Sequence, residues 1–371
     1  MPIVSNPLDL LFRDLFFELE GLTEKGRLLL KLEGHNVTGS IKIKPALFMI
    51  ADLERRGLIE PHRSTLVESS SGNLGIALAL ICGLRGYGFI CVTDPNISAI
   101  NRRSIEAYGG QVIVVDRRDA NGGYLETRID LIRSLLQENA NYVWLNQYAN
   151  PFNMRAHEEW TALEILDEVP QVSHLYVGSG TTGTIMGLAR RFAQLSPATK
   201  VIAVEPEHSV TFDQSRIGRR LIPGIGTSRR PELADPTLLD RVVYVPESDA
   251  IRMCHWLARR HGLLLGGSSG SVLAAVAADA ALFDAGSTVV AISPDLGDKY
   301  MDTIYAPEWV RANFGHLANG HDGDATAPKP VCEPLSEVIA RHSGRLGLRI
   351  GGRNGSVDHM RRSANGHARG L

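Results

Sequence analysis

Lys42 is the residue of this 371-residue chain whose type and position first suggest covalent chemistry. It lies in residues 36–45, Asn-Val-Thr-Gly-Ser-Ile-Lys-Ile-Lys-Pro, where a glycine-containing turn leads into a predicted helix. A lysine at the start of a helix lies at the positive end of the helix dipole, which lowers its pKa. A neutral amine of this kind can form an imine with a carbonyl group. The ordinary alternative is a solvated lysine, because lysine side chains are mostly exposed.

A second segment, residues 68–75, combines hydroxyl groups and glycines directly after a predicted strand. Ser70, Ser71 and Gly72 would present backbone N–H groups at the start of the next helix, where such groups can hold a carboxylate. The side chain of Asn73 can donate a hydrogen bond to a phenolic oxygen. An ordinary helix cap uses the same residue types, so both interpretations stay open for this segment alone.

Two further segments also follow predicted strands. Residues 178–184, Gly-Ser-Gly-Thr-Thr-Gly-Thr, can form a phosphate-binding loop of backbone amides and hydroxyls before a helix. This loop lacks the Gly-Lys-Ser/Thr ending of a P-loop, which disfavours a nucleotide-binding protein. Residues 266–271 place Ser268 where its hydroxyl can meet a ring nitrogen or cap a helix. All four segments therefore lie at strand-to-helix transitions, where open α/β sheets bind ligands.

The elements that must position these residues alternate along the chain from about residue 28 to residue 311. Several apolar runs are rich in valine and isoleucine throughout, the pattern of strands buried on both faces. The predicted strands are 28–32, 64–68, 88–93, 111–115, 142–146, 174–177, 200–205, 241–245 and 288–293, and the predicted helices are 44–56, 74–84, 99–108, 127–139, 155–168, 185–194, 249–261 and 271–285. This alternation predicts an α/β protein with parallel sheets covered by helices.

The four segments together resemble the fold-type II pyridoxal 5′-phosphate (PLP) enzymes of the cysteine synthase and cystathionine β-synthase group. The resemblance covers about residues 4–311 and rests on the order and spacing of the motifs. The family patterns Asn-Pro-x-Gly-Ser-x-Lys-Asp-Arg, Thr-Ser-Gly-Asn-Thr-Gly and Gly-Thr-Gly-Gly-Thr are matched with departures at Val37, Ile43, Lys44, Leu74 and Thr182. The resemblance implies a fold class of two doubly wound α/β domains, like that of the tryptophan synthase β-subunit.

The resemblance also implies a role for each motif residue. Lys42 is implied to hold PLP as a Schiff base, and Ser268 to contact the pyridine nitrogen. The other implied cofactor-binding residues are Asn73, at the phenolic oxygen, and Gly180, Thr181, Thr182, Gly183 and Thr184, at the phosphate. The residues implied to bind the substrate carboxylate are Ser70, Ser71, Gly72 and Gln147.

Three parts of the chain are expected. Residues 39–150 would form a small α/β domain, and residues 1–38 with 151–311 a large PLP-binding domain, with PLP in the cleft between them. Residues 312–371 are rich in glycine, histidine, arginine and asparagine, so we expect a mostly disordered tail with one short helix around 335–342. A homodimer is implied by the resemblance.

The implied reaction is replacement of the β-substituent of an O-activated L-serine, O-phospho-L-serine or O-acetyl-L-serine, through an aminoacrylate. Residues 71–75, 94–98, 119–128 and 223–226 resemble the branch of the family that joins O-phospho-L-serine to L-glutamate, a step toward 2,3-diaminopropionate in siderophore biosynthesis. L-Glutamate is therefore the favoured nucleophile. Four arginines are candidates for binding a phosphate leaving group: Arg219, Arg220, Arg229 and Arg230.

The first alternative is sulfur transfer as in cysteine synthase, with sulfide or thiosulfate as the nucleophile and cysteine or S-sulfocysteine as the product. A serine or threonine dehydratase would instead release ammonia and a keto acid without a second substrate. A catalytically silent PLP-binding protein is disfavoured because Lys42 is present.

The composition narrows the class of partner. A net charge of −2 and a pI near 6.6 indicate no nucleic-acid or membrane-surface partner, which leaves small amino-acid substrates. The four cysteines form no CxxC pair and no zinc-like cluster, so no metal is expected and a reducing cytoplasm fits. The N-terminal apolar run contains Asp9, Arg13 and Asp14, unlike a signal peptide, and the absence of an 18-residue apolar run predicts no transmembrane helix.

Overall fold

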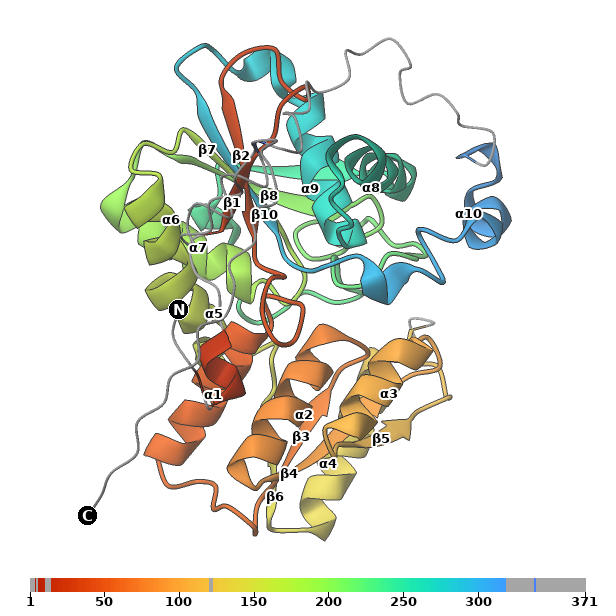
Figure 1. The fold of residues 1–371 in the computed structure, drawn as a ribbon. Coiled ribbons are helices and arrows are strands. Elements are labelled where there is room, and N and C mark those ends of the chain that lie inside the picture. Colours follow the sequence, from red (N-terminus) through yellow and green to blue (C-terminus); the bar gives the residue numbers. More distant parts are fainter. Residues whose placement is uncertain (1–3, 5, 11–14, 120–122, 318–336, 338–371) are drawn as a thin grey trace, which may run out of the picture. The chain divides into compact units, whose positions relative to one another are not determined.

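The computed structural model describes residues 4, 6–10, 15–119, 123–317 and 337. The chain divides into two units, residues 1–327 and residues 328–371, and the fold described below belongs to the first. The described part of the first unit contains two sheets with helices on both faces of each (Figure 1). This arrangement confirms the predicted α/β class. The division into two domains at the expected boundaries stays a prediction.

The larger sheet has six strands in the order β1-β2-β10-β7-β8-β9. Its strands are β1 (Phe16–Glu18), β2 (Arg27–Leu32), β7 (His174–Gly178), β8 (Lys200–Pro206), β9 (Arg241–Val245) and β10 (Thr288–Ser293). All pairs in this sheet are parallel except β1 with β2, which is antiparallel. The parallel strands therefore end at one edge of the sheet, where the loops that follow them lie together.

Alternate residues of these strands enter two separate cores, as the pleat of a strand requires. Leu28, Leu30 and Tyr176 pack against α8 (Glu247–His261) and α9 (Gly267–Ala278). Leu29 and Leu175 pack against the opposite layer. That layer consists of α5 (Pro151–Ala156), α6 (Ala162–Glu168) and α7 (Gly183–Leu195). Burial on both faces explains why the strands are apolar throughout.

The smaller sheet has four parallel strands in the order β5-β4-β3-β6. Its strands are β3 (Thr65–Ser69), β4 (Gly88–Thr93), β5 (Gln111–Val114) and β6 (Tyr142–Trp144). One core contains residues of α1 (Ile43–Arg55), α2 (Asn73–Arg85) and α3 (Ala99–Ala107). A second core, on the other side of the pleat, packs Val67, Ile90 and Val92 against Ile132 of α4 (Leu125–Glu138).

All nine predicted strands are present, and the structure adds and corrects some elements. It adds β1, which is too short to give a periodic signal, and α10 (Pro307–Phe314). The single helix predicted over 155–168 is interrupted by a π-helical turn, His157–Thr161. The helix predicted over 271–285 begins at Gly267 and ends at Ala278. The tail is predicted to begin at residue 312, whereas α10 extends to Phe314 and a 3₁₀ turn follows at Gly315–Leu317. The helix predicted around 335–342 lies outside the described residues except for one position.

Two glycines allow α7 to pack unusually closely against the π-helical turn. Gly183 and Gly187 are four residues apart and lie on the same face of the helix. A Cβ atom added to Gly183 would overlap the side chain of Asn153, and one added to Gly187 would overlap the carbonyl oxygen of Met154 and the amide of Glu158. The start of α7 therefore takes its position from these two contacts.

Gly187→Ala should destabilise the protein although alanine is the better helix former. Propensity alone would stabilise the helix by about 1 kcal/mol. Overlap with backbone atoms, which cannot rotate away, should instead lower the free energy of unfolding by about 1–3 kcal/mol. Urea unfolding measures this difference. Ala193→Gly, on the exposed face of the same helix, is the matched control and should cost about 1 kcal/mol. An unchanged or increased stability of Gly187→Ala would contradict the close packing.

A buried carboxyl group lies near the end of β8. Glu205 is fully buried, accepts a hydrogen bond from the Thr211 hydroxyl at 3.2 Å, and its Oε1 atom has no partner among the described residues. Burial raises the pKa of Glu205 from 4.5 to about 8, although hydrogen bonds from Ser209 and Thr211 oppose this. The folded protein therefore retains a proton on Glu205 at pH values where the unfolded chain has lost it.

This raised pKa predicts a pH-dependent difference between the wild-type protein and Glu205→Gln. Between about pH 4.5 and pH 8 the unfolded state releases the proton and the folded state does not, so the stability of the wild type falls as pH rises. Glutamine has no such proton. From pH 5 to pH 8, the free energy of unfolding of the variant should therefore rise by about 2–4 kcal/mol relative to that of the wild type. Urea unfolding of both proteins at the two pH values measures this change. The exposed control Glu138→Gln should show no such gain, and a pH-independent difference for Glu205→Gln would refute the assignment.

Candidate active site

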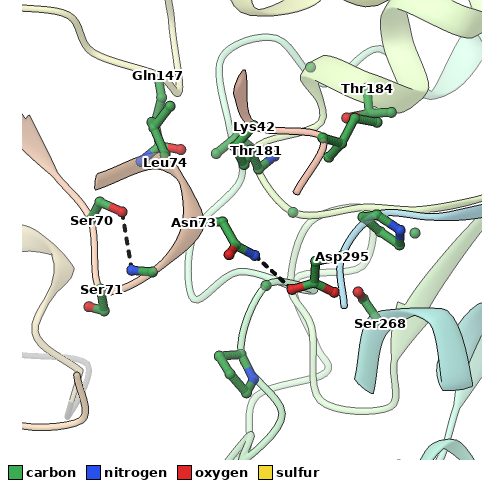
Figure 2. A pocket seen from close by; sticks show the side chains of 18 of the residues that line it. Lys42, Ser70, Ser71, Asn73, Leu74, Gln147, Thr181, Thr184, Ser268 and Asp295 are labelled. Carbon is green, nitrogen blue, oxygen red and sulfur yellow. Dashed lines mark hydrogen bonds between the residues drawn. The ribbon is translucent and has the colours of Figure 1, made fainter. Parts of the chain in front are cut away.

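A cavity of about 240 Å³ lies at the carboxyl ends of β3, β7 and β10. This space greatly exceeds what one water molecule needs, so the cavity can admit a small molecule. The starts of α1, α2, α7 and α9 also line it. The residues predicted to bind the cofactor or the substrate carboxylate all line this one cavity: Lys42, Ser70, Ser71, Gly72, Asn73, Gln147, Gly180, Thr181, Thr182, Gly183, Thr184 and Ser268. Figure 2 shows how the side chains of several of them lie.

Lys42 is the residue immediately before α1, as the sequence suggested. The part of the chain that the structure describes offers its Nζ atom no hydrogen bond and no ion pair. Burial lowers the pKa of Lys42, and the charge of Asp295 only partly opposes this effect. The local structure therefore favours a neutral amine within the cavity.

The loop between β7 and α7 has the features of an anion-binding site. Thr182 has a left-handed backbone, with φ of 66°, which turns the chain into the helix. The hydroxyls of Ser179 and Thr182 are buried and find no partner among the described residues. The first N–H groups of any helix lack partners within the helix, and the helix dipole makes that end positive. A Cβ atom added to Gly180 would approach the Gly224 carbonyl oxygen at 3.3 Å, so glycine at this position allows the two backbone segments to lie close together.

The segment before α2 combines capping with a free surface toward the cavity. The Ser70 hydroxyl accepts hydrogen bonds from the amides of Gly72 at 3.3 Å and Gly75 at 3.1 Å, so the cap interpretation holds for it. Ser70 and Gly72 nevertheless line the cavity. Gln147 is fixed by donating from Nε2 to the Ser69 carbonyl at 2.8 Å. These contacts give the segment a defined shape before any ligand binds.

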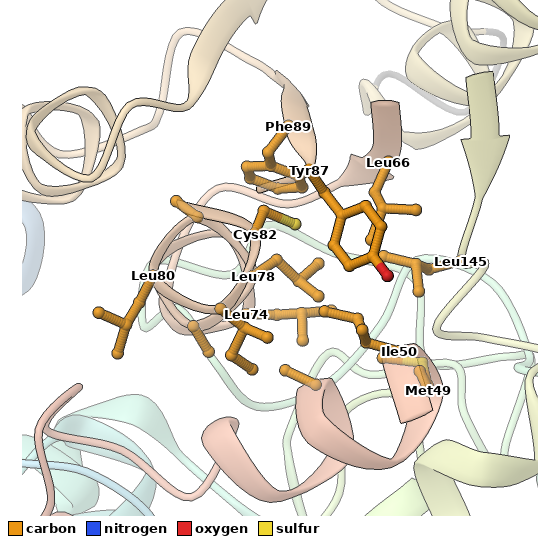
Figure 3. Packing of buried hydrophobic residues seen from close by; sticks show 14 of the residues in the cluster. Met49, Ile50, Leu66, Leu74, Leu78, Leu80, Cys82, Tyr87, Phe89 and Leu145 are labelled. Atoms are coloured by element: carbon orange, nitrogen blue, oxygen red, sulfur yellow. The ribbon is translucent and has the colours of Figure 1, made fainter. Parts of the chain in front are cut away.

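Helix α2, which carries this segment, is apolar on all sides and lies within a core. Leu74, Leu78 and Cys82 are buried in the same cluster as Met49 of α1 and Leu66 of β3 (Figure 3). A helix with apolar residues all round must be covered on every side. The start of α2 is therefore held in place by packing along the rest of the helix.

Asp295 is a cavity residue that the sequence analysis did not identify. It follows β10, is fully buried, and its Oδ2 accepts hydrogen bonds from Tyr300 and, at 2.7 Å, from Nδ2 of Asn73 (Figure 2). Its Oδ1 atom has no partner among the described residues. Burial raises the pKa of Asp295, while the bonds from Tyr300 and Asn73 oppose the rise. We had expected only the neutral Ser268 on this side, and Figure 2 shows Ser268 pointing toward this carboxyl group.

Lys299 determines which way the Asn73 amide faces. Its Nζ donates to Asn73 Oδ1 at 2.7 Å and to the Thr38 carbonyl at 2.7 Å. Because lysine only donates, the oxygen of the amide must face Lys299 and the NH₂ group must face Asp295. This orientation directs the donor side of the Asn73 amide toward Asp295 in the cavity wall. No sequence motif predicts this contact, since Lys299 is 226 positions from Asn73.

Arg128 is the arginine that lines the cavity, in place of the four that we predicted. Its Nη1 donates to the Ser71 hydroxyl at 2.8 Å and pairs with Asp94 at 3.1 Å, and its Nε is buried without a partner among the described residues. None of the predicted four lines the cavity: Arg219, Arg220, Arg229 and Arg230. The sequence signal for Arg128 is the segment 119–128, which ends at this arginine and resembles one branch of the family.

Two properties of the described residues bear on other functions. No helix among them is long and apolar enough to cross a membrane. Within the same residues, no cluster of three or more histidine, cysteine, aspartate or glutamate side chains is arranged to hold a metal ion.

Comparison with known proteins agrees with this geometry. The family described as pyridoxal-phosphate dependent enzyme matches residues 15–295. N-(2-amino-2-carboxyethyl)-L-glutamate synthase of Cupriavidus metallidurans is 41% identical over 284 residues, 76% of this chain and 83% of that protein. O-ureido-L-serine synthase has a TM-score of 0.75 at 31% identity, covering 81% of this chain and 95% of that one. A hydrogen sulfide-producing enzyme from Fusobacterium nucleatum has a TM-score of 0.76 at 30% identity, covering 81% and 99%.

These likenesses extend over both sheets, and the solved structures confirm the fold-type II class. The chain therefore belongs to the family of pyridoxal-phosphate-dependent enzymes, and PLP is its cofactor.

Proposed function

We propose that this enzyme replaces the β-substituent of O-phospho-L-serine, with L-glutamate as the nucleophile. The observation that carries the proposal is the position of Lys42. This buried amine, without an ion pair among the described residues, shares one cavity with an anion-binding loop and with an arginine. Such a cavity suits a substrate that carries a carboxylate and a second anionic group.

The residues present fit PLP. The loop Gly180–Thr184 offers the start of α7 and the unpaired Thr182 hydroxyl to the phosphate. Lys42 provides the amine for the aldehyde, and Asn73, which lines the same cavity, is the residue for the phenolic oxygen. Bound PLP supplies an electron sink that allows the Cα proton of an amino acid to be removed and its β-substituent to leave.

Lys42 has the properties of the general base. Its Nζ takes the proton from Cα of the substrate, and this requires the neutral form that burial favours. The backbone amides at the start of α2 orient the α-carboxylate of the substrate. The Ser71 hydroxyl already donates to Asp94 at 3.0 Å and the Gly72 amide to Ser70 at 3.3 Å, so these two groups shape the wall rather than bind the carboxylate. Gln147, fixed by its bond to Ser69, lies in the same wall. These contacts hold Cα within reach of one amine.

Arg128 supports phosphate as the leaving group. A phosphate ester leaves as an anion, and a guanidinium binds phosphate oxygens in a planar, bidentate manner. Arg128 is held in the cavity wall by Ser71 and Asp94, and its Nε has no partner among the described residues. Acetate leaves with a single negative charge, so the Arg128 guanidinium would stabilise it less than it stabilises phosphate.

The relatives support a serine-derived skeleton and an amine nucleophile. The name of the 41% identical relative denotes L-glutamate that carries a 2-amino-2-carboxyethyl group on nitrogen. O-ureido-L-serine has the same three-carbon skeleton with an oxygen substituent at Cβ. The hydrogen sulfide-producing relative keeps sulfur transfer as the second candidate. A cytoplasmic homodimer acting in siderophore biosynthesis, as the resemblance implies, is part of this proposal.

Lys42→Ala should abolish the visible absorbance of the bound cofactor and lower the turnover number by about 10³-fold or more, because both the imine and the general base are lost. The spectrum and steady-state rates of the purified enzyme measure both effects. The exposed control Lys25→Ala should leave both unchanged. A variant that keeps the visible band would show that another amine holds PLP.

Arg128→Met should lower kcat/KM for O-phospho-L-serine by about 10²-fold, since a charge-assisted hydrogen bond to the leaving group is lost, and should affect O-acetyl-L-serine much less. Arg128→Lys, which keeps the charge beside Asp94, should lose less. Arg219→Met makes the same substitution at an exposed arginine and is the matched control.

The same assay identifies the nucleophile. L-Glutamate, sulfide and thiosulfate are supplied in turn, and the products are identified by mass spectrometry. Formation of the glutamate adduct supports the proposal, whereas cysteine or S-sulfocysteine alone would replace it with sulfur transfer. Ammonia and pyruvate without a second substrate would indicate a dehydratase.

A further inference from the structure

A buried chain of hydrogen bonds leads away from the anion-binding loop into the protein interior. The Thr184 hydroxyl lies 3.2 Å from Nε2 of His157, and Nδ1 of His157 lies 3.0 Å from the Thr161 hydroxyl. The Nζ atom of Lys44 donates to the same Thr161 hydroxyl at 3.4 Å. His157 and Thr161 are fully buried. None of these contacts takes part in the function proposed above, although Thr184 lines the cavity.

Lys44 is fixed at the far end of this chain within a buried cluster of four charged side chains, its own included. Its Nζ is 3.0 Å from Glu33 and 2.6 Å from Glu164, and Lys31 pairs with the same Glu164 oxygen at 3.0 Å. The indole N–H of Trp160 donates to the other oxygen of Glu164 at 2.6 Å. Two cations and two carboxylates balance one another, as buried charges must. These contacts therefore hold the Lys44 side chain in place.

The chain has a direction because Lys44 can only donate. Thr161 accepts from Lys44, and its own hydroxyl hydrogen has Nδ1 of His157 as the remaining partner among the described residues. Burial lowers the pKa of His157 well below its usual value, and the charges of Lys42 and Lys44 add to the effect, so the imidazole is neutral. A neutral imidazole that accepts at Nδ1 must carry its hydrogen on Nε2 and donate it to Thr184.

The direction of these hydrogen bonds determines which way the Thr184 hydroxyl points. The Thr184 hydroxyl accepts from His157, so its own hydrogen is free to point toward the cavity that Thr184 lines. A donor in this position suits an anion and disfavours a cation or a second donor.

The π-helical turn makes the chain possible. His157 and Thr161 are its first and last residues. His157 reaches Thr184 at the start of α7, where Gly187 allows that helix to approach the backbone at Met154 and Glu158. π-turns inside α-helices occur often at functional sites. A regular helix over the same residues would place the following side chains differently.

We propose that His157 is a positioning residue that keeps the Thr184 hydroxyl oriented as a hydrogen-bond donor to the cofactor phosphate, with Lys44 setting the direction through Thr161. The proposal rests on the assignment of the loop Gly180–Thr184 as the phosphate site in the function proposed above. It adds a second layer of residues, contributed by α1 and the π-helical turn, to that site.

The tautomer of His157 gives a test that does not depend on activity. The purified full-length enzyme is labelled with ¹⁵N in histidine side chains, and the His157 signal is assigned by its absence in His157→Leu. We expect the neutral form with the hydrogen on Nε2. A hydrogen on Nδ1, or an imidazolium at neutral pH, would overturn the proposed direction.

Retention of PLP by the holoenzyme during equilibrium dialysis gives the second test. His157→Leu should weaken PLP binding by about 10- to 100-fold, the range expected for loss of one hydrogen bond to a charged group. His157→Gln, whose amide can accept from Thr161 and donate to Thr184, should stay within about 3-fold of the wild type. His174→Leu, at the opposite end of β7 from the cavity, is the matched control and should retain PLP normally.

A double-mutant cycle separates positioning from a general loss of packing. Thr184→Val should weaken PLP binding about as much as His157→Leu, and the double variant should be little worse than either, because both remove the same bond. Additive losses, or a His157→Leu enzyme that retains PLP like the wild type, would overturn the proposal. A wild-type enzyme that holds no PLP at all would instead overturn the phosphate-site assignment itself, whatever the tautomer of His157.

Discussion

The unpaired backbone amides at the start of α7 impose the constraint on which the rest of the site depends. These donors lie in a buried loop, where a polar group without a partner is costly. A bound anion provides partners and also matches the positive end of the helix dipole. Gly183 and Gly187 place the helix start by allowing close contact with α5 and the π-helical turn. The cavity, the cofactor and the buried chain beneath the loop can all be understood as consequences of this helix end.

Two lysines near the start of α1 show how environment assigns chemistry to identical side chains. Lys44 lies among Glu33, Glu164 and Lys31, and its charge is balanced. Lys42, two positions earlier, is buried in the cavity without such partners among the described residues, so burial lowers its pKa. Lys44 therefore suits a structural role, whereas Lys42 suits imine formation. Lys44 stands where the family pattern has arginine, and it uses its positive charge to pair with Glu33 and Glu164.

The cavity also contains a carboxyl group close to its lysine. Asp295 lowers the cost of a transient positive charge on Lys42, while Tyr300 and Asn73 hold one of its oxygens. Its other oxygen has no partner among the described residues. A site that must accept a proton on an amine and release it again benefits from such a neighbour, because the opposite charge stabilises the protonated amine without pairing with it permanently.

The sequence alone predicted the fold class, the nine main strands and twelve residues that the structure brings together around one cavity. Strand burial on both faces and glycine-rich strand-to-helix turns are local patterns, so they are visible in the order of the residues. Tertiary structure alone decided which other residues reach the cavity. Arg128, rather than the four predicted arginines, faces it because α4 packs beside the strand that ends at Ser69. Contacts such as Lys299 with Asn73 and Lys44 with Glu164 join residues 226 and 120 positions apart, and no local pattern encodes separations of that length.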